Sequence, residues 1–248
     1  MASVNIGRAE EAASIPTEPS PPVPGTAVFL WIPKCAGTSI WDTLLTTGSG
    51  QMLHGYMGGG AYYKPQYYKG GIDGFQPDVA YTTFLHTDIR VILDISNRLT
   101  LDWVHTRFVF AFVRNTWDRL VSLWHHLFRR HESIANSRGK VFKTFIENCV
   151  ADDRESIGAK DVNGLSMASP QIDWLRLYGE WLPDFVGRYE NLRQDWQRVC
   201  QELGISAELQ HKNKTENRKP YREYYDDRLR RLVAVAYEEE IDMFKFTF

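Results

Sequence analysis

The sequence predicts a three-layer α/β fold, in which a central parallel sheet is flanked by helices. Two apolar runs of six residues, 27–32 and 108–113, have the length and continuity of strands buried on both faces. A short polar loop and an amphipathic helix pattern follow each run, and strands that alternate with helices form parallel sheets. The length of 248 residues suits one domain of this class. A ligand site is expected at the carboxyl ends of the strands.

The other elements follow from hydrophobic spacing and from residues that begin helices. Residues 38–47 place apolar side chains on one helical face, and the run from Trp117 to Phe128 gives the clearest amphipathic helix. Ser169 and Pro170 have the residue types of a helix N-cap and first helical position. The patterns also predict strands at 79–85 and 185–189 and helices at 89–99, 192–203 and 226–239.

Composition excludes several classes of protein. The 29 basic and 31 acidic residues nearly cancel, and the isoelectric point near 6.4 argues against a dedicated nucleic-acid binder. No apolar run is long enough to span a bilayer. Three scattered cysteines form neither a zinc-site spacing nor a disulfide framework. We therefore expect a cytoplasmic protein with no membrane span, no nucleic-acid partner and no metal site.

Two segments depart from the pattern of a packed domain. Residues 1–25 contain five prolines and no apolar signal-peptide core, so we expect a disordered tail before a domain at 26–248. A proline-rich docking peptide is the alternative for this tail. Residues 54–75 contain seven glycines and five tyrosines without helical or strand periodicity. Long loops of this kind are often functional, and the aromatic residues favour a binding loop.

The loop after the first strand has the features of an anion site. Backbone amides from Cys35 to Ser39 lie at a helix N-terminus, where the partial positive charge favours an anion. Gly37 lets a ligand approach the backbone closely, and Thr38 and Ser39 add hydroxyl donors. Lys34 supplies a mobile charge but lies four residues before Thr38, so the loop is not a Walker A sequence. Alternatively, Thr38 or Ser39 only caps the helix and Lys34 is solvated.

A second anion site is predicted where the strand at 108–113 ends. Arg114 follows this strand directly, and its guanidinium could hold a phosphate through two hydrogen bonds. Ser122 lies about one and a half turns into the next helix, off its apolar stripe, so its hydroxyl can reach the same cleft. Alternatively, Arg114 pairs with Asp118 and Ser122 is a surface residue.

Flanking residues of this second motif have expected structural roles. Asn115 or Thr116 can cap the helix that begins near Trp117. Three further arginines in the motif and its helix are expected to be solvated, namely Arg119, Arg129 and Arg130.

The motifs IPKCAGTS, residues 32–39, and FAFVRNTWDRLVS, residues 110–122, resemble the paired phosphosulfate-binding motifs of the PAPS-dependent sulfotransferases. The likeness is greatest to the branch that includes the carbohydrate sulfotransferases and their bacterial relatives. It continues in DFVGRYENL and YREYY and covers about residues 27–248. The resemblance implies a P-loop-like fold, PAPS as the sulfuryl donor and PAP as the product.

The resemblance also implies which residues bind the donor. The 5′-phosphosulfate would be held by the loop residues Lys34, Cys35, Ala36, Gly37, Thr38 and Ser39. Arg114 and Ser122 would hold the 3′-phosphate, and Lys212 and Arg218 belong to a basic segment that resembles the family's late nucleotide-covering loop. Cys35 stands where many relatives have Thr, which removes one hydroxyl donor and leaves the backbone amides in place. Thr116 stands where many have Pro.

Sulfuryl transfer to a hydroxyl group needs a base, because an alcohol is a poor nucleophile. His86 is the first candidate, since it follows the predicted strand at 79–85 and relatives often place a base at a corresponding strand end. His54 is the second candidate, whereas His125 and His126 are expected on the long helix surface.

The sequence thus predicts a sulfotransferase that moves the sulfuryl group of PAPS in line, without a metal, to a carbohydrate or small-molecule hydroxyl. Lys34 would neutralise the charge of the leaving oxygen, and residues 54–75 would contact the acceptor. The alternatives are a P-loop nucleotide-dependent phosphotransferase and a non-catalytic nucleotide- or glycan-binding module.

Overall fold

A computed structural model describes residues 23–53, 78–85, 100–130, 141–151, 165–209 and 218–248. At its centre is a parallel five-stranded sheet of order β2-β3-β1-β4-β7, which confirms the predicted fold class. The strands are β1 (Ala27–Trp31), β2 (Gly50–Leu53), β3 (Tyr81–Leu85), β4 (Phe108–Val113) and β7 (Phe185–Arg188). The two central strands, β1 and β4, are almost entirely buried, as their unbroken apolar runs predicted.

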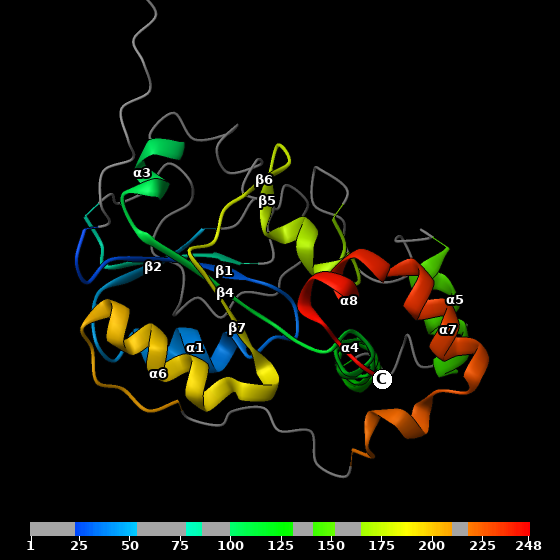
Figure 1. Cartoon of the computed structure of the whole chain (residues 1–248). Helices are drawn as coiled ribbons and strands as arrows, with labels where there is room; N and C mark the ends of the chain where they lie inside the picture. Colours follow the sequence, from blue (N-terminus) through cyan, green and yellow to red (C-terminus); the bar gives the residue numbers. More distant parts are fainter. Residues whose placement is uncertain (1–22, 54–77, 86–99, 131–140, 152–164, 210–217) are drawn as a thin grey trace, which may run out of the picture.

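Helices flank the sheet on both faces (Figure 1). α1 (Gly37–Leu44) and α6 (Leu192–Leu203) cover one face, and the short α3 (Leu101–His105) lies on the other. α1 packs through three buried apolar side chains, those of Ile40, Trp41 and Leu44. A stacked pair, Phe29 and Phe110, joins the two central strands with ring centroids 5.0 Å apart.

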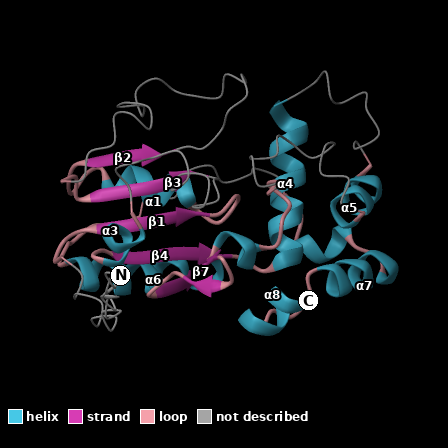
Figure 2. Cartoon of the chain, turned by 90° about the horizontal axis from the view of Figure 1, so that it is seen from above, coloured by secondary structure: helices cyan, strands magenta, loops and turns pink. Residues whose placement is uncertain are grey.

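The remaining helices gather beyond the carboxyl ends of the strands. Figure 2 shows the strand arrows pointing toward the half of the molecule that holds α4, α5, α7 and α8. Their bounds are α4 (Thr116–Arg130), α5 (Phe142–Val150), α7 (Asp227–Ala236) and α8 (Glu238–Phe244). α4 starts only three residues after β4 ends, so its N-terminus is fixed at the edge of the sheet where a ligand is expected. No helix in the described ranges is both long and apolar enough to traverse a bilayer.

The register of the sheet brings the loops that follow β1 and β4 together. Leu30 of β1 pairs with Ala111 of β4, and Trp31 pairs with Leu85 of β3. Val113 at the end of β4 pairs with Arg188 of β7. The carboxyl ends of β1, β3, β4 and β7 therefore lie side by side.

Several predicted elements differ from the observed ones. The sequence patterns missed β2 and the two-residue strands β5 (Arg176–Leu177) and β6 (Glu180–Trp181), which are too short to show a period. Ser169 and Pro170 precede only a single turn, η6 (Gln171–Trp174), because the Ser169 hydroxyl accepts from the Ser166 amide instead of capping a helix.

The predicted C-terminal helix at 226–239 is in fact two helices, α7 and α8. Buried Tyr237 separates them with a non-helical backbone and donates its hydroxyl to the carbonyl of Ala168 at 2.7 Å. Two short turns, η7 (Tyr189–Asn191) and η8 (Tyr221–Tyr224), precede α6 and α7. The helix expected at 89–99 and the tail at 1–22 lie outside the described residues.

Candidate functional site

The loop after β1 forms a tight turn into α1. Lys34 and Ala36 both have left-handed backbone conformations, with φ of 70° and 67°. Ala36 is the N-cap residue of α1, and no side chain caps this end of the helix by a hydrogen bond. The first-turn amides have no partner within the helix, and an αL turn before them orients such amides toward an anion. This loop is therefore our candidate for the predicted anion site.

Gly37 has a packing role that the sequence pattern did not indicate. A Cβ atom at this position would lie 1.9 Å from Nε1 of Trp31, the last residue of β1. The indole therefore fills the space that a side chain would need. Glycine is required here for strand-to-helix packing, and this requirement is independent of any ligand.

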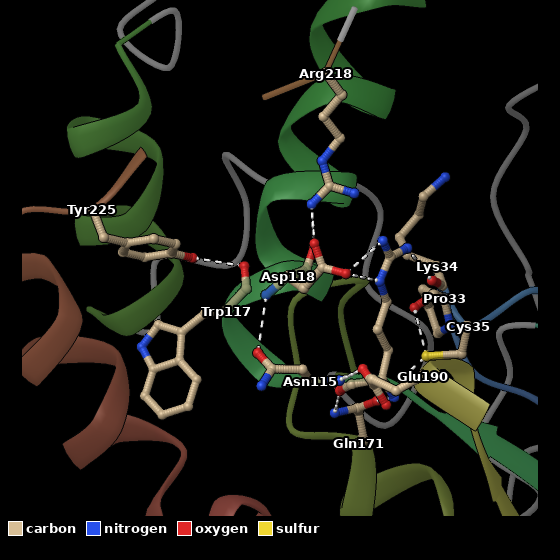
Figure 3. Close-up of polar contacts among 11 residues, drawn as sticks. Pro33, Lys34, Cys35, Asn115, Trp117, Asp118, Gln171, Glu190, Arg218 and Tyr225 are labelled. Atoms are coloured by element: carbon tan, nitrogen blue, oxygen red, sulfur yellow. Dashed lines mark hydrogen bonds and ion pairs between the residues drawn. The ribbon is translucent and has the colours of Figure 1, made fainter. Parts of the chain in front are cut away.

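Arg114 joins the two predicted loops. Its side chain is only 7% exposed, and its Nη1 donates to the carbonyl oxygen of Lys34 at 3.2 Å (Figure 3). Its Nε and Nη2 both lie 2.7 Å from Oδ2 of Asp118, one turn along α4. The ring of Tyr189 lies 3.9 Å beneath the guanidinium carbon. Arg114 therefore lies at the end of β4, as predicted. It forms the ion pair with Asp118 that the sequence indicated as the alternative to phosphate binding.

Asp118 also forms an ion pair with Arg218, which lies in the segment before η8. The Nη2 atom of Arg218 donates to Oδ1 of Asp118 and, at 3.2 Å, to the backbone oxygen of the same residue. In Figure 3 the amino group of Lys34 and the guanidinium of Arg218 both lie away from Gln171. Two predicted donor-binding residues from distant parts of the chain, Arg114 and Arg218, thus bond to one carboxylate, and the backbone of a third, Lys34, bonds to Arg114.

A buried hydrogen-bond network supports Arg114 from beneath. The Oε1 atom of Gln171 accepts from the Arg114 amide at 2.8 Å, and its Nε2 donates to the Arg114 carbonyl at 2.9 Å. Fully buried Glu240 of α8 accepts from the Gln171 side chain at 3.0 Å, from the Gln171 amide and from the Thr116 hydroxyl. The end of β4 is therefore fixed to the C-terminal helix.

The side chain of Cys35 faces this network. Its thiol donates to Oε1 of Gln171 at 3.3 Å, and the residue is 1% exposed. Burial raises the pKa of this thiol to about 12, against the opposing effect of nearby Arg119 and Arg114. At neutral pH the thiol is neutral and is directed away from the loop surface. Cys35 can therefore contribute to the predicted anion site only through its backbone.

Helix α4 is capped as expected, but one of its arginines is not where the sequence placed it. Oδ1 of Asn115 accepts from the Asp118 amide at 3.3 Å, and the Asn115 amide donates to Glu190 at 2.6 Å. Arg119, expected to be solvated, is completely buried. It donates to three consecutive backbone carbonyls, those of Met167, Ala168 and Ser169, at 2.8–3.4 Å. Buried carbonyl groups that need donors explain this position.

The other predicted site residues divide into two groups. Thr38 is half-buried and Ser39 is buried in the first turn of α1, and half-buried Ser122 lies one turn after Asp118 on the same face of α4. His54, His86, Lys212 and the segment 54–75 lie outside the described residues. His125 is half-buried and exchanges a hydrogen bond of 2.9 Å with the Tyr224 hydroxyl.

Three residues of the site were missed as functional candidates. Asp118 was considered only as an ion-pair partner, although its spacing of four from Arg114 was a signal that both lie on one helical face. Gln171 and Glu240 lie far from Arg114 in the sequence. No local sequence pattern predicts that Gln171 bonds to Arg114 or that Glu240 bonds to Gln171.

A cavity of about 310 Å³ lies beside the start of α4. Its lining residues are Asn115, Asp118, Arg188, Glu190, Tyr221, Arg222, Lys245 and Thr247. Three of these side chains are cationic and two are carboxylates. The charged surface around Asp118 therefore continues toward the C-terminal residues.

Comparison with known proteins identifies the family of this arrangement. Residues 26–247 match the family described as "Sulfotransferase family". The fold is similar to that of mouse sulfotransferase SULT7A1 complexed with PAP, with a TM-score of 0.53 and 11% identity over 87% of this chain and 83% of that chain. It is also similar to a sulfotransferase from Alicyclobacillus acidocaldarius, with a TM-score of 0.47 and 14% identity over 91% and 97% of the two chains. A search of curated proteins finds no match.

The family match confirms the resemblance that the two motifs carried, that of a PAPS-dependent sulfotransferase. At 11% identity, the mouse structure supports the fold alone.

Proposed function

Because the chain belongs to the sulfotransferase family, we propose that it transfers the sulfuryl group of PAPS to a hydroxyl group of a carbohydrate or small-molecule acceptor. The observation that carries this proposal is the hydrogen bond between Arg114 Nη1 and the Lys34 carbonyl. This bond joins the loop after β1 to the residue that follows β4. It supports the proposal because a nucleotide with two charged ends needs two neighbouring anion sites.

The residues present are suited to PAPS. The uncapped N-terminus of α1 and the Lys34 ammonium would hold its 5′-phosphosulfate. Arg114 and Arg218, with the hydroxyl of Ser122, would hold its 3′-phosphate. These groups are cations, amides and hydroxyls, which are the donors that phosphate and sulfate oxygens require.

When bound, PAPS supplies an activated sulfuryl group and a phosphate leaving group. Lys34 and the first amides of α1 stabilise the negative charge that develops on the leaving oxygen. Arg114 orients the nucleotide from the neighbouring strand end, so that the acceptor oxygen can be aligned opposite the leaving oxygen.

His86 is our proposed general base, which removes the proton from the acceptor hydroxyl. This residue follows β3 directly, and β3 pairs with β1 up to the pair Leu85 and Trp31. The segment 54–75, our proposed acceptor-binding loop, follows β2 in the same way. His54 is the alternative base.

A binding measurement tests the donor assignment. Calorimetry should give tight binding of PAP to the wild-type protein and much weaker binding of ATP. The Arg114→Ala variant should lose about 2 kcal/mol or more of PAP binding energy, as expected for charged hydrogen bonds. Arg193→Ala on the exposed face of α6 is the matched control and should bind PAP normally. Equal PAP affinity in the Arg114 variant would contradict the assignment.

A turnover measurement tests the reaction. Incubation with [³⁵S]PAPS and a panel of sugars, phenols and aliphatic alcohols should label at least one class of acceptor, and labelling should survive EDTA. His86→Ala should lower turnover on the order of 10²–10⁴-fold at unchanged PAP affinity. Full turnover in this variant would contradict the assignment of His86 as the base, and His54 would become the candidate. Binding of PAP without any labelling would instead support a non-catalytic module.

A further inference from the structure

We propose that Asp118 is a positioning residue that holds Arg114 and Arg218 side by side for the 3′-phosphate. The proposal rests on the proposed function and deepens it, because it names the residue that sets the geometry of the two arginines. Asp118 itself carries the wrong charge to bind a phosphate, so its role is exerted through the two arginines.

The contacts of Asp118 divide evenly between the two arginines. Oδ2 receives Nε and Nη2 of Arg114, each at 2.7 Å, whereas Oδ1 receives Nη2 of Arg218. Arg218 is fixed a second time by the Asp118 carbonyl at 3.2 Å. The three side chains are largely buried, with exposures of 7%, 14% and 19% for Arg114, Arg218 and Asp118. Two guanidinium groups repel each other, and the carboxylate between them offsets this repulsion.

Both arginines keep donors for a ligand. A guanidinium has five N–H groups. Asp118 and the Lys34 carbonyl occupy three of those on Arg114, which leaves one on each terminal nitrogen. The buried Nε of Arg218 has no hydrogen-bond partner among the described residues. Two parallel N–H groups match two oxygens of a phosphate, and a second guanidinium at the same place matches a dianion.

This arrangement predicts selection by charge. A 3′-phosphate gains hydrogen bonds from two fixed cations, whereas a 3′-hydroxyl would leave them without an acceptor. The benefit depends on the Asp118 carboxylate, because this group bonds to both cations. Without it Arg114 keeps its contacts with the Lys34 carbonyl and the Tyr189 ring, and Arg218 keeps its contact with the Asp118 backbone oxygen, but the pair is no longer joined.

The Asp118→Asn variant tests the proposal. Asparagine keeps one acceptor oxygen but presents an NH₂ group to the second arginine, so one guanidinium is released. We expect PAP affinity to fall about tenfold to a hundredfold, the value of one or two charged hydrogen bonds, while 5′-AMP affinity changes less than about threefold. Asp227→Asn is the matched control, because this exposed carboxylate pairs with Arg230 on the surface of α7.

A second variant, Arg218→Gln, breaks the same contact but leaves the Arg114 pair with Asp118 intact. It should also lower PAP affinity and spare 5′-AMP, and the double variant with Asp118→Asn should bind PAP no more weakly than Asp118→Asn alone. Thermal unfolding monitors the fold of each variant, and Arg218→Gln carries the test if Asp118→Asn does not fold.

Each result decides between outcomes. Equal weakening of PAP and 5′-AMP would assign Asp118 a merely structural role and overturn the proposal. Tighter PAP binding by Asp118→Asn would also overturn it, because Asp118 would then compete with the ligand. Normal PAP binding by both variants refutes the positioning role alone. A wild-type protein that does not bind PAP refutes the proposed function as well.

Discussion

Two arginines five residues apart, Arg114 and Arg119, are placed in opposite ways at the start of α4. Arg119 is completely buried and directs its terminal nitrogens at three backbone carbonyls of one turn. Arg114 lies where β4 ends, and a carboxylate and one carbonyl occupy only part of its donors. Both carry the same charge, but the first stabilises backbone and the second keeps donors that our proposal assigns to a ligand.

The comparison separates burial from function. Burying an arginine is unfavourable unless its guanidinium is hydrogen-bonded. Arg119 donates hydrogen bonds to the segment that leads to Gln171. This segment in turn fixes Arg114 through Gln171. The buried arginine thus builds the platform on which the other arginine lies.

Replacing Arg119 should give the largest loss of stability. Arg119→Met fills a similar volume but leaves the carbonyls of Met167, Ala168 and Ser169 without donors. We expect the free energy of unfolding in urea to fall by about 3 kcal/mol or more. Arg193→Met on the α6 surface is the control, with a change within about 0.5 kcal/mol. Equal stability of the two variants would show that the Arg119 bonds add nothing.

Glu240→Gln should have a smaller effect on the same platform. The substitution keeps the shape but places an NH₂ group among donors, namely the Gln171 amide, the Gln171 side chain and the Thr116 hydroxyl. A loss of about 1–3 kcal/mol in the unfolding free energy is expected for one such mismatch. The exposed neighbour Glu238, changed in the same way, should unfold like the wild type. A stable Glu240→Gln protein would mean that the platform does not need this carboxylate.

The sequence predicted the sheet and the site loops because both depend on local patterns. Continuous apolar runs identify β1 and β4, and the polar residues that follow them lie at the ligand edge by the topology of parallel sheets. The prediction that Arg119 is solvated was wrong. Its partners lie 48–50 residues away and are backbone atoms, which no pattern of side chains in the sequence indicates.

The partners of Arg114 were predictable only in part. The pairing with Asp118 follows from helical spacing, whereas the contacts of Gln171 and of Arg218 arise from tertiary packing over 57 and 100 residues. The packing role of Gly37 could not be predicted from the sequence either, because the Trp31 indole reaches this residue only in the folded turn.

Cys35 gives the smallest expected effect and tests the buried side of the first loop through pH. Burial raises the pKa of its thiol from 9.0 to about 12, so below pH 9 the thiol is protonated in both folded and unfolded chains. Between pH 9 and about 12 only the unfolded chain loses this proton, and stability therefore falls as the pH rises, by at most about 1.4 kcal/mol per pH unit for one thiol.

Urea unfolding at pH 8.5 and pH 10.5 measures this contribution. Cys35→Ala removes the titrating group, so its unfolding free energy should fall less between the two pH values than that of the wild type. Other groups with raised pKa values, such as Tyr225, titrate in both proteins and cancel in the difference. Identical slopes for the two proteins would mean that water reaches the Cys35 thiol, and its side chain would then belong to the open, ligand-facing part of the loop with Lys34.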